Sequence, residues 1–458
     1  MSLKALTRRE FARRASALSL AGVGAPWALN LAAIGEAAAQ AATDYKALVC
    51  VFLYGGNDYG DTLIPYDLSN YNAYQTIRTG IARPRDTLAA TALAPSVALP
   101  DARQMAFAPE FARLKTIFDA GKLGVLLNVG TLIQPTTLAQ YNARSVPLPP
   151  KLFSHNDQQS VWQSSLPEGA TSGWGGRMGD LFLGSNGNAT FTCVNVSGNA
   201  VFMSGTQAVQ YQVAASGSVA LRGASAPLYG SQACADALRA LVTAPRTHLL
   251  EAELTRVMSR AISANSTLTT ALAGIAPLAT PFTATNPLAL QLQMVARMIA
   301  ARDALSAKRQ VFFVSLGGFD NHDFLAAQHP GLLTNVADAI GSFYDATVEL
   351  GVANQVTTFT ASDFGRTLAS NGDGSDHGWG SHHVVVGGAV RGRSFYGQLP
   401  ATAVNGPDDV GQGRLLPTTS VDQLAATFAS WMGVSATELA GVVPNIVNFN
   451  SKDIGFFA

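Results

Sequence analysis

Three apolar runs in this sequence each end abruptly at a turn that carries an aspartate. The runs cover residues 47–54, 311–316 and 356–360, and two of them reach the aspartate through a Gly-Gly pair. Such runs are typical of strands that are buried on both faces of a parallel sheet. Because parallel strands end at one edge of a sheet, where ligands bind in α/β proteins, we expect the three aspartates to lie together. These aspartates are Asp58, Asp320 and Asp363.

Helical patterns between the runs indicate an α/β fold. A helix is predicted over residues 109–120 and a further strand over residues 123–129. Asn286 followed by a proline predicts a helix start, and Ser420 with Gln423 predicts a capping box at another. We therefore predict a mostly parallel central sheet that is flanked by helices.

The predicted domain is a single unit over residues 40–458 with one stretch of different composition. Residues from about 185 to 285 are rich in Ala, Ser, Thr and Gly and poor in charge. Strand-like runs at residues 189–196 and 209–213 come first, and helical stretches follow. We interpret this stretch as an inserted subdomain.

The first 39 residues have the order of an export signal. Arg8 and Arg9 form a twin-arginine pair, a moderately apolar stretch covers residues 15–34, and small residues follow. The alternative is an ordinary amphipathic helix. We expect residues 1–39 to be a removable signal, with the twin-arginine translocase as a partner during export and the periplasm as the destination. No later run has the roughly 18 apolar residues of a membrane span, so we expect none in the mature protein.

The charge balance excludes two broad classes of protein. The chain has 30 basic and 30 acidic residues, and without residues 1–39 the balance is 25 to 28. A nucleic-acid-binding protein needs a basic excess, so we expect no nucleic-acid partner. Apolar residues make up 48% of the chain and charged residues 13%, which is the opposite of the composition of a disordered chain.

The three cysteines are too few for a disulfide framework or an iron–sulfur cluster. Cys50 lies in an apolar run and fits a buried strand. Whether Cys193 and Cys234 pair in an oxidising compartment stays open. No GxGxxG motif stands at a strand–helix junction, so a redox enzyme is the weaker alternative.

Histidines gather in the same polar segments as the aspartates. His322 follows Asp320 by two residues, and His377 stands in an Asp-His-Gly-Trp-Gly segment. Crowded carboxylates repel each other unless a cation lies among them, and mixed carboxylate and imidazole ligands suit zinc, manganese or iron more than calcium. Any one histidine could instead be structural, and we expect His248 and His329 to be surface or helix-end residues. The candidate metal ligands are Asp58, Asp320, His322, Asp363, His377 and His382, with His383 as an alternative to His382.

Two further residues are candidates for catalysis. Arg366 follows a predicted strand end and could hold a phosphate or sulfate oxygen in its guanidinium fork, or pair with a neighbouring aspartate. Ser154 stands before His155 and a predicted helix over residues 156–162. It could be a nucleophile at a helix N-terminus, or only the N-cap.

The chain resembles the twin-arginine-exported bacterial family catalogued as domain of unknown function 1501, over nearly the whole mature chain. The motifs that carry the resemblance are Gly55-Gly56-Asn57-Asp58, Phe153-Ser154-His155-Asn156-Asp157-Gln158-Gln159 with Trp162, Gly173-Trp174-Gly175-Gly176-Arg177, Leu316-Gly317-Gly318-Phe319-Asp320-Asn321-His322, Ser362-Asp363-Phe364-Gly365-Arg366-Thr367 and Asp376-His377-Gly378-Trp379-Gly380. That family in turn looks like a distant branch of the alkaline phosphatase and sulfatase superfamily.

The resemblance implies an alkaline-phosphatase-like fold. That superfamily binds one or two divalent metals at the carboxyl ends of a parallel sheet. It hydrolyses phosphate or sulfate esters with a Ser, Thr or modified Cys nucleophile.

Four residues carry over by motif. Asp58 would be the ligand after the first strand, and Asp320 and His322 match a later Asp…His ligand segment at a shorter spacing. Asp363 matches the Asp of a Ser-Asp-His-Gly strand end, but Phe364 replaces its histidine here. A later histidine would then supply the missing imidazole, and the candidates are His377, His382 and His383.

The resemblance and the motifs favour an exported metal-dependent hydrolase of phosphate or sulfate esters, with a small-molecule or glycan ester as substrate. The alternative is a non-catalytic periplasmic binding or assembly protein that retains the superfamily fold. Loss of the Ser-Asp-His-Gly histidine favours this alternative.

Overall fold

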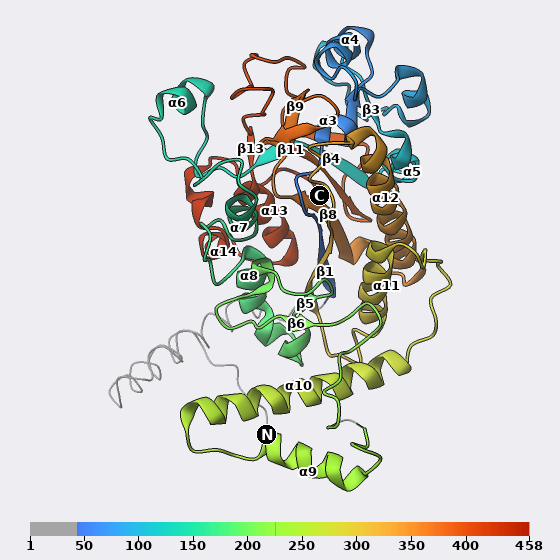
Figure 1. Ribbon diagram of the computed structural model, residues 1–458, viewed down its shortest axis with the longest axis vertical. Helices are drawn as coiled ribbons and strands as arrows, with labels where there is room; N and C mark the ends of the chain where they lie inside the picture. The colour runs from blue at the N-terminus through green and yellow to red at the C-terminus, as the bar shows by residue number, and fades with distance from the viewer. Residues whose placement is uncertain (1–43, 225, 458) are drawn as a thin grey trace, which may run out of the picture.

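A nine-stranded, mostly parallel sheet forms the centre of the protein (Figure 1). The structure is a computed structural model that describes residues 44–224 and 226–457, so the predicted signal at residues 1–39 lies outside the described residues. The strand order is β12-β4-β11-β8-β1-β7-β5-β6, and β13 pairs with β4. Among the described strands of this sheet, β11 alone runs antiparallel to its neighbours. The strands are β1 (Lys46–Leu53), β4 (Leu123–Gly130), β5 (Cys193–Asn195), β6 (Tyr211–Gln212), β7 (Arg309–Leu316), β8 (Val356–Ser362), β11 (Ser381–Gly387), β12 (Ser394–Tyr396) and β13 (Thr419–Ser420).

The central strand β1 shows why its apolar run is continuous. It lies between β7 and β8 and is parallel to both. Val49 and Val51 pack in the core on one face of the sheet, and Leu48, Cys50 and Phe52 pack in the core on the other. All five side chains are fully buried. The predicted strand with two buried faces is confirmed.

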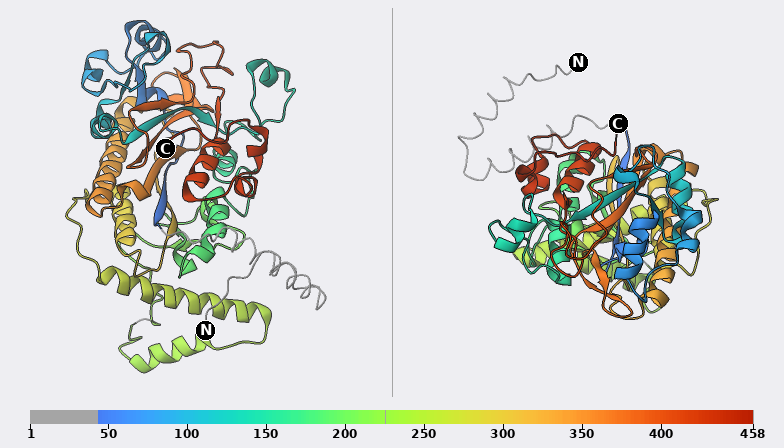
Figure 2. Two further views of the ribbon diagram at one scale, coloured as in Figure 1. Left: turned by 180° about the vertical axis from the view of Figure 1, so that it is seen from behind. Right: turned by 90° about the horizontal axis from the view of Figure 1, so that it is seen from above.

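Helices cover both faces of the sheet (Figure 2). One layer consists of α5 (Ala112–Asp119), α11 (Pro287–Ala300) and α12 (Leu325–Glu349), and the other includes α8 (Trp174–Phe182), α13 (Val421–Met432) and α14 (Leu439–Val442). The predicted helix starts are confirmed. The Asn286 side chain accepts hydrogen bonds from two backbone N–H groups of α11, and Ser420 and Gln423 form a capping box on α13.

The stretch predicted as an insertion, residues 185–285, divides into two parts. Its first part supplies β5 and β6, which extend the central sheet beyond β7 instead of forming a separate unit. Its second part supplies α9 (Gln232–Thr243) and α10 (Leu249–Ala273). These two helices lie at the lower end of the molecule in Figure 1, away from the upper end where β1 leads into α3.

Short elements follow the carboxyl ends of the central strands. β9 (Arg366–Ser370) and β10 (Ser375–His377) form a hairpin directly after β8, and β2 (Leu63–Pro65) pairs with β3 (Met105–Phe107). The neighbouring helices are α3 (Tyr59–Thr62), α4 (Leu68–Ile77), α6 (Leu138–Ala143) and α7 (His155–Ser164). These elements supply the side chains of the site described below.

Two further expectations concern cysteines and membrane spans. Cys193 is buried and Cys234 is exposed, and both are free thiols, so the pairing left open above is not formed. Along residues 44–224 and 226–457, no helix combines the length and the apolarity that crossing a membrane requires.

Candidate metal centre

Two histidines and an aspartate come together beyond the carboxyl ends of β7 and β8. His155, Asp320 and His377 each offer one ligand atom, and these atoms lie within 4.8 Å of one another. Asp320 follows β7, His155 is the first residue of α7, and His377 is the last residue of β10. His322 adjoins the group, because its Nε2 lies 3.1 Å from Asp320 Oδ1 and 2.8 Å from His377 Nε2. The structure therefore brings together three of the predicted ligands, with His155 as an addition.

Each of the three imidazoles is oriented by a bond at Nδ1. His155 Nδ1 lies 2.7 Å from Asp363 Oδ2, and His377 Nδ1 lies 2.7 Å from the backbone oxygen of Phe153. His322 Nδ1 lies 3.2 Å from Asp376 Oδ1. These residues supply carboxylate or carbonyl oxygens, which only accept hydrogen bonds, so each Nδ1 is the donor in its contact. In the neutral form of a ring with its proton on Nδ1, Nε2 has a lone pair that can bind a metal ion.

The Nε2 atoms of the three histidines converge on Asp320. His155 Nε2 is 3.3 Å from Asp320 Oδ2, and His377 Nε2 is 3.3 Å from Asp320 Oδ1. His155 Nε2 is buried and forms no hydrogen bond. Two imidazole lone pairs that face each other, as in His322 and His377, repel unless a cation or a proton lies between them. Histidines that bind metals commonly have this arrangement, with Nδ1 donating to a carboxylate or carbonyl oxygen and Nε2 directed at the ion.

Asp320 is held in place by Arg366. The guanidinium donates to Asp320 Oδ1 at 2.8 Å and to the backbone oxygen of Gly55 at 2.9 Å, and it also bonds Ser375. Arg366 is fully buried. Burial of Asp320 would raise the pKa of its carboxyl, but the hydrogen bond and charge of Arg366, with His155 and His322, lower the pKa below its usual value. Of the two interpretations of Arg366, the structure shows the ion pair with an aspartate.

The electrostatic surroundings of His155 and His377 differ. The hydrogen bond to Asp363 raises the pKa of His155 above its usual value, against the effect of burial. Burial lowers the pKa of His377, and the charges of His155 and Arg366 add to this. The two rings lie against the Phe364 ring, with centroids 4.9 and 4.8 Å away. Phe364, which replaces the histidine of the superfamily motif, thus forms an apolar wall beside both imidazoles.

Asp363 lies beside the group but bonds to His155. Its Oδ2 accepts from His155, from Gln159 Nε2 at 2.8 Å and from the backbone N–H of Gly55 at 3.2 Å. The side chain is fully buried, and Oδ1 forms no hydrogen bond. Asp363 was predicted as a metal ligand, but in the structure it orients the ring of His155.

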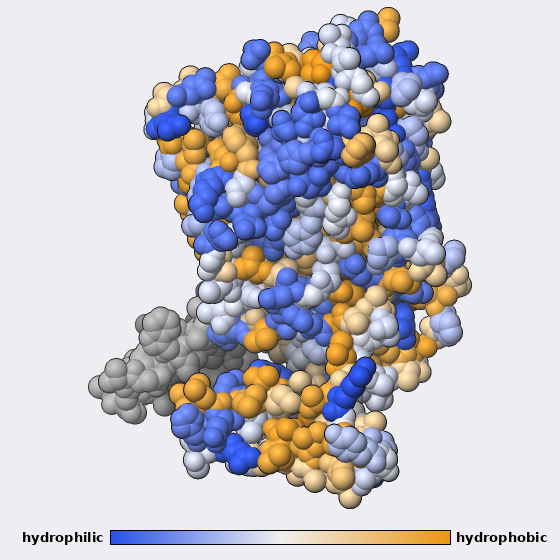
Figure 3. Space-filling view, viewed as in Figure 1, coloured by the Kyte–Doolittle hydropathy of each residue, from blue (hydrophilic) through white to orange (hydrophobic). Residues whose placement is uncertain are grey.

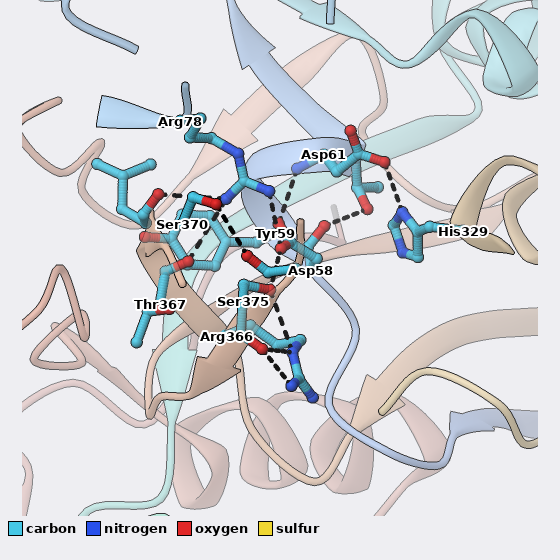
Figure 4. A network of polar contacts seen from close by, with 12 residues as sticks. Asp58, Tyr59, Asp61, Arg78, His329, Arg366, Thr367, Ser370 and Ser375 are labelled. Carbon is cyan, nitrogen blue, oxygen red and sulfur yellow. Dashed lines mark hydrogen bonds and ion pairs between the residues drawn. The ribbon is translucent and has the colours of Figure 1, made fainter. Parts of the chain in front are cut away.

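The predicted ligand Asp58 is engaged elsewhere. Its carboxylate forms a buried ion pair with Arg78 at 2.9 Å and accepts a hydrogen bond from Ser375 Oγ at 2.6 Å (Figure 4). It also caps α3 through the N–H of Asp61. Ser375 bonds Arg366, so Asp58 connects with Asp320 only through these two residues. The structure thus gives Asp58 a supporting position, because its Oδ2 accepts from Arg78 and Ser375 and its Oδ1 accepts from the N–H of Asp61.

His382 and His383 are not part of the group. His382 Nδ1 accepts from the backbone N–H of Asn128 at 3.0 Å, and His383 Nδ1 lies 3.2 Å from the hydroxyl of Thr360. Burial lowers the pKa of His382 to about 4 and that of His383 to about 3. Both therefore occupy positions of neutral core histidines at the start of β11.

His329, expected at a surface or helix end, is completely buried. It bonds Asp61 through Nδ1 at 2.7 Å (Figure 4). It also bonds Asn57 through Nε2 at 3.1 Å. His248 is the N-cap residue of α10 and exposed, as expected.

Ser154 holds the N-cap position of α7 but does not cap the helix with its side chain. Its hydroxyl donates instead to Asp157 Oδ2 at 3.0 Å, and Asp157 is 3% exposed. Ser154 precedes His155, and Phe153 supplies the oxygen that orients His377. The Ser154 hydroxyl thus lies next to the histidine group in the chain and is paired with a carboxylate.

The motifs agree with a family model. A model described as protein of unknown function (DUF1501) matches residues 45–443. The chain belongs to this family. The matched region contains every residue of the centre. No curated protein matches the chain.

Solved structures of low identity are also similar to this DUF1501 protein. One is Ps i-CgsB in complex with k-i-k-neocarrahexaose, with a TM-score of 0.37 and 10% identity over 90% of this chain and 78% of the other. Another is the PsFucS1 sulfatase from Pseudoalteromonas sp., with a TM-score of 0.34 and 9% identity over 90% of this chain and 73% of the other.

Sequence reasoning missed three residues of the centre. His155, Gln159 and Asp376 lie in the recognised motifs but were not among the predicted site residues. The signal for His155 is its position in a polar segment, Ser-His-Asn-Asp-Gln-Gln, at the start of a helix. Gln159 lies four residues on, on the same helix face, so both reach Asp363.

Proposed function

We propose that His155, Asp320, His322 and His377 bind a divalent metal ion. The observation that carries this proposal is that three imidazoles have Nδ1 bonded to acceptors and Nε2 directed toward one carboxylate. Three nitrogens and one oxygen suit zinc, manganese or iron, whereas calcium prefers oxygen ligands. The buried Nε2 of His155, which lacks a hydrogen-bond partner, fits a ligand atom.

We further propose that the centre hydrolyses phosphate or sulfate esters of small molecules or glycans. An ion held there would act as a Lewis acid toward an ester oxygen. Arg366 holds Asp320, Asp363 holds His155, and Phe364 excludes water from one side of the two rings. The position beyond the strand ends and the resemblance to the alkaline phosphatase and sulfatase superfamily support this reaction class.

Ser154 is the proposed nucleophile. Its hydroxyl donates to the buried carboxylate of Asp157, which is an acceptor for the hydroxyl proton. Ser154→Ala is expected to retain the metal and lose ester hydrolysis. Unchanged turnover by this variant would assign the attack to water.

The second candidate function is a metal-binding periplasmic protein without catalysis. One observation favours it: each nitrogen of Arg366 bonds to the protein itself, so this guanidinium does not face a substrate oxyanion. A protein that holds metal but hydrolyses no ester in a broad phosphatase and sulfatase panel would support this candidate.

Elemental analysis of the purified protein tests the metal centre. We expect a stoichiometric divalent metal in the wild-type protein and its loss in Asp320→Ala and His377→Ala. His248→Ala is the matched control, because His248 is an exposed histidine outside the centre. A folded, metal-free wild-type protein that binds no added zinc, manganese or iron would refute the proposal.

We propose that the twin-arginine translocase exports the protein to the periplasm. Twin-arginine substrates cross already folded, which suits a chain that takes up a metal first. Replacing Arg8 and Arg9 by lysine should retain the protein in the cytoplasm. Unchanged export of this variant in cell fractionation would contradict this route.

A further inference from the structure

An apolar stripe runs along helix α10, and its surroundings differ between the two halves of the helix. In the second half the stripe consists of Ala264, Leu268 and Ala271, which are at most 7% exposed and belong to the main core. In the first half the same stripe continues with spacings of four, three and four residues. Its members there are Leu250, Leu254, Val257 and Ala261. This spacing places them on one helix face, as in the seam of a coiled coil.

The first half of the stripe is open to solvent. Leu250, Leu254 and Val257 are 73%, 61% and 41% exposed. The partly buried residues of this half, such as Ala252 and Ser259, lie on another side of α10. Among the described residues, α9 therefore packs along α10 without covering the stripe. Figure 3 shows apolar surface over the α9–α10 pair at the lower end of the molecule.

A hollow lies beside the stripe. A cavity of about 410 Å³ is lined by Val257 and Ala261 of α10 and by Val209, Tyr211 and Val219 next to the sheet edge. Val209 and Val219 are 63% and 70% exposed. The small side chain of Ala261 leaves room there for a larger apolar side chain.

We propose that this surface pairs with the same surface of a second copy of the chain, with the two α10 helices antiparallel. A two-fold axis between residues 255 and 256 places Leu254 against Val257 of the second copy. It also places Leu250 against Ala261 and the adjoining hollow. Each pair forms twice, as a two-fold interface requires.

Charge complementarity supports a second copy as the occupant. Antiparallel helices bring the same flank of the stripe together, so the same axis places Glu253 beside Arg260 of the second copy, and both residues are exposed. Opposite charges at the rim of such a seam fix its register and orientation. A membrane-binding helix instead has a uniformly basic polar face, whereas Glu251, Glu253, Arg256 and Arg260 give this one both signs.

Sedimentation equilibrium of the purified protein tests the dimer. We expect the wild-type protein to have twice the mass of the chain and Leu254→Glu to have the mass of a monomer. Leu68→Glu is the matched control, because Leu68 on α4 is also 61% exposed and lies near the other end of the molecule (Figure 1). Thermal melting checks that each variant is folded, and a cooperative transition of Leu254→Glu shows that its monomer is folded.

A charge exchange tests the antiparallel register. Glu253→Arg alone and Arg260→Glu alone should each weaken dimerisation by about tenfold or more, and the double variant should restore it. A monomeric wild-type protein would overturn the proposal, and so would a dimer that Leu254→Glu leaves intact. If the two single variants and the double variant dimerise equally well, the antiparallel pairing is wrong. A monomeric wild-type protein that binds anionic vesicles through this stripe would assign the surface to a membrane.

Discussion

At the scale of residues, the proposed metal centre depends on side chains outside the proposed ligand set. Asp363 is fully buried and fixes the ring of His155, with Gln159 and Gly55 fixing Asp363 in turn. Gly55 has φ +118°, and a Cβ there would lie 2.4 Å from the backbone nitrogen of Asp320. The Gly-Gly turn is therefore needed for close approach of the two strand ends.

Replacing the carboxylate that orients His155 should weaken metal binding without abolishing it. In Asp363→Asn the amide still fits the space but no longer attracts the Nδ1 proton as strongly. We expect the dissociation constant for zinc to rise about 10–100-fold, as for other partners of ligating histidines. Competition with a chelator of known affinity measures it. Asp119→Asn, a surface change on α5, is the control, and equal affinities in all three proteins would contradict the orienting role.

The buried ion pair of Arg78 and Asp58 should be needed for the stability of the fold. Arg78 is 0% and Asp58 1% exposed, and Arg78→Met would leave the carboxylate buried without its partner. We expect a loss of about 3–5 kcal/mol in the free energy of unfolding. Arg78→Met with Asp58→Asn should recover part of it, because no buried charge remains. Urea unfolding of the three proteins gives the comparison, and a double variant less stable than the single one would contradict this.

At the scale of elements, the sequence predicts strands and helix starts but not the partners of each side chain. The apolar runs and the caps at Asn286 and Ser420 are local patterns, so the elements follow from them. Asp58 was predicted as a ligand because its strand ends where a ligand would bind. Its actual partner, Arg78, approaches from α4, a contact of tertiary structure that local pattern does not encode. For the same reason, the sequence did not predict that His329 is buried against Asp61.

Asp422 at the start of α13 should give the protein a pH-dependent stability. Burial raises the pKa of its carboxyl from 3.8 to about 6, against the hydrogen bonds from Ser165 and Asn445 and the charge of Arg177. Because the folded state prefers the neutral acid, this contribution is complete below about pH 4 and is lost as the pH rises through 6. The difference amounts to about 3 kcal/mol.

Asp422→Asn removes this titration and should flatten the dependence. We expect the variant to gain stability relative to the wild-type protein as the pH rises from 4 to 7, in urea unfolding at a series of pH values. Asp86→Asn, which replaces an exposed residue in another part of the chain, is the control. Its free energy of unfolding should change with pH as that of the wild-type protein does. A constant difference between Asp422→Asn and the wild-type protein across this range would assign the effect to a cause other than titration.

At the scale of the whole molecule, the centre joins segments that are distant in the chain. His155, Asp320 and His377 come from α7, the end of β7 and β10, and only the folded sheet brings them together. The composition of residues 185–285 suggested a separate insertion, yet β5 and β6 pair with the main sheet. The strand-like runs at residues 189–196 and 209–213 predicted both strands, but a local pattern does not encode which strand each one pairs with.

Since the unfolded chain lacks the assembled centre, a bound ion should stabilise the whole domain. At a free ion concentration of 100 times the dissociation constant, the gain is about 2.7 kcal/mol. A strong chelator should therefore lower the melting temperature of the wild-type protein. The melting temperature of Asp320→Ala should be the same with and without the chelator. His248→Ala should respond as the wild-type protein does. An ion that binds only the native state must add to the stability of that state. If the chelator removes the metal but leaves the wild-type melting temperature unchanged, the ion is therefore bound outside the cooperatively folded domain.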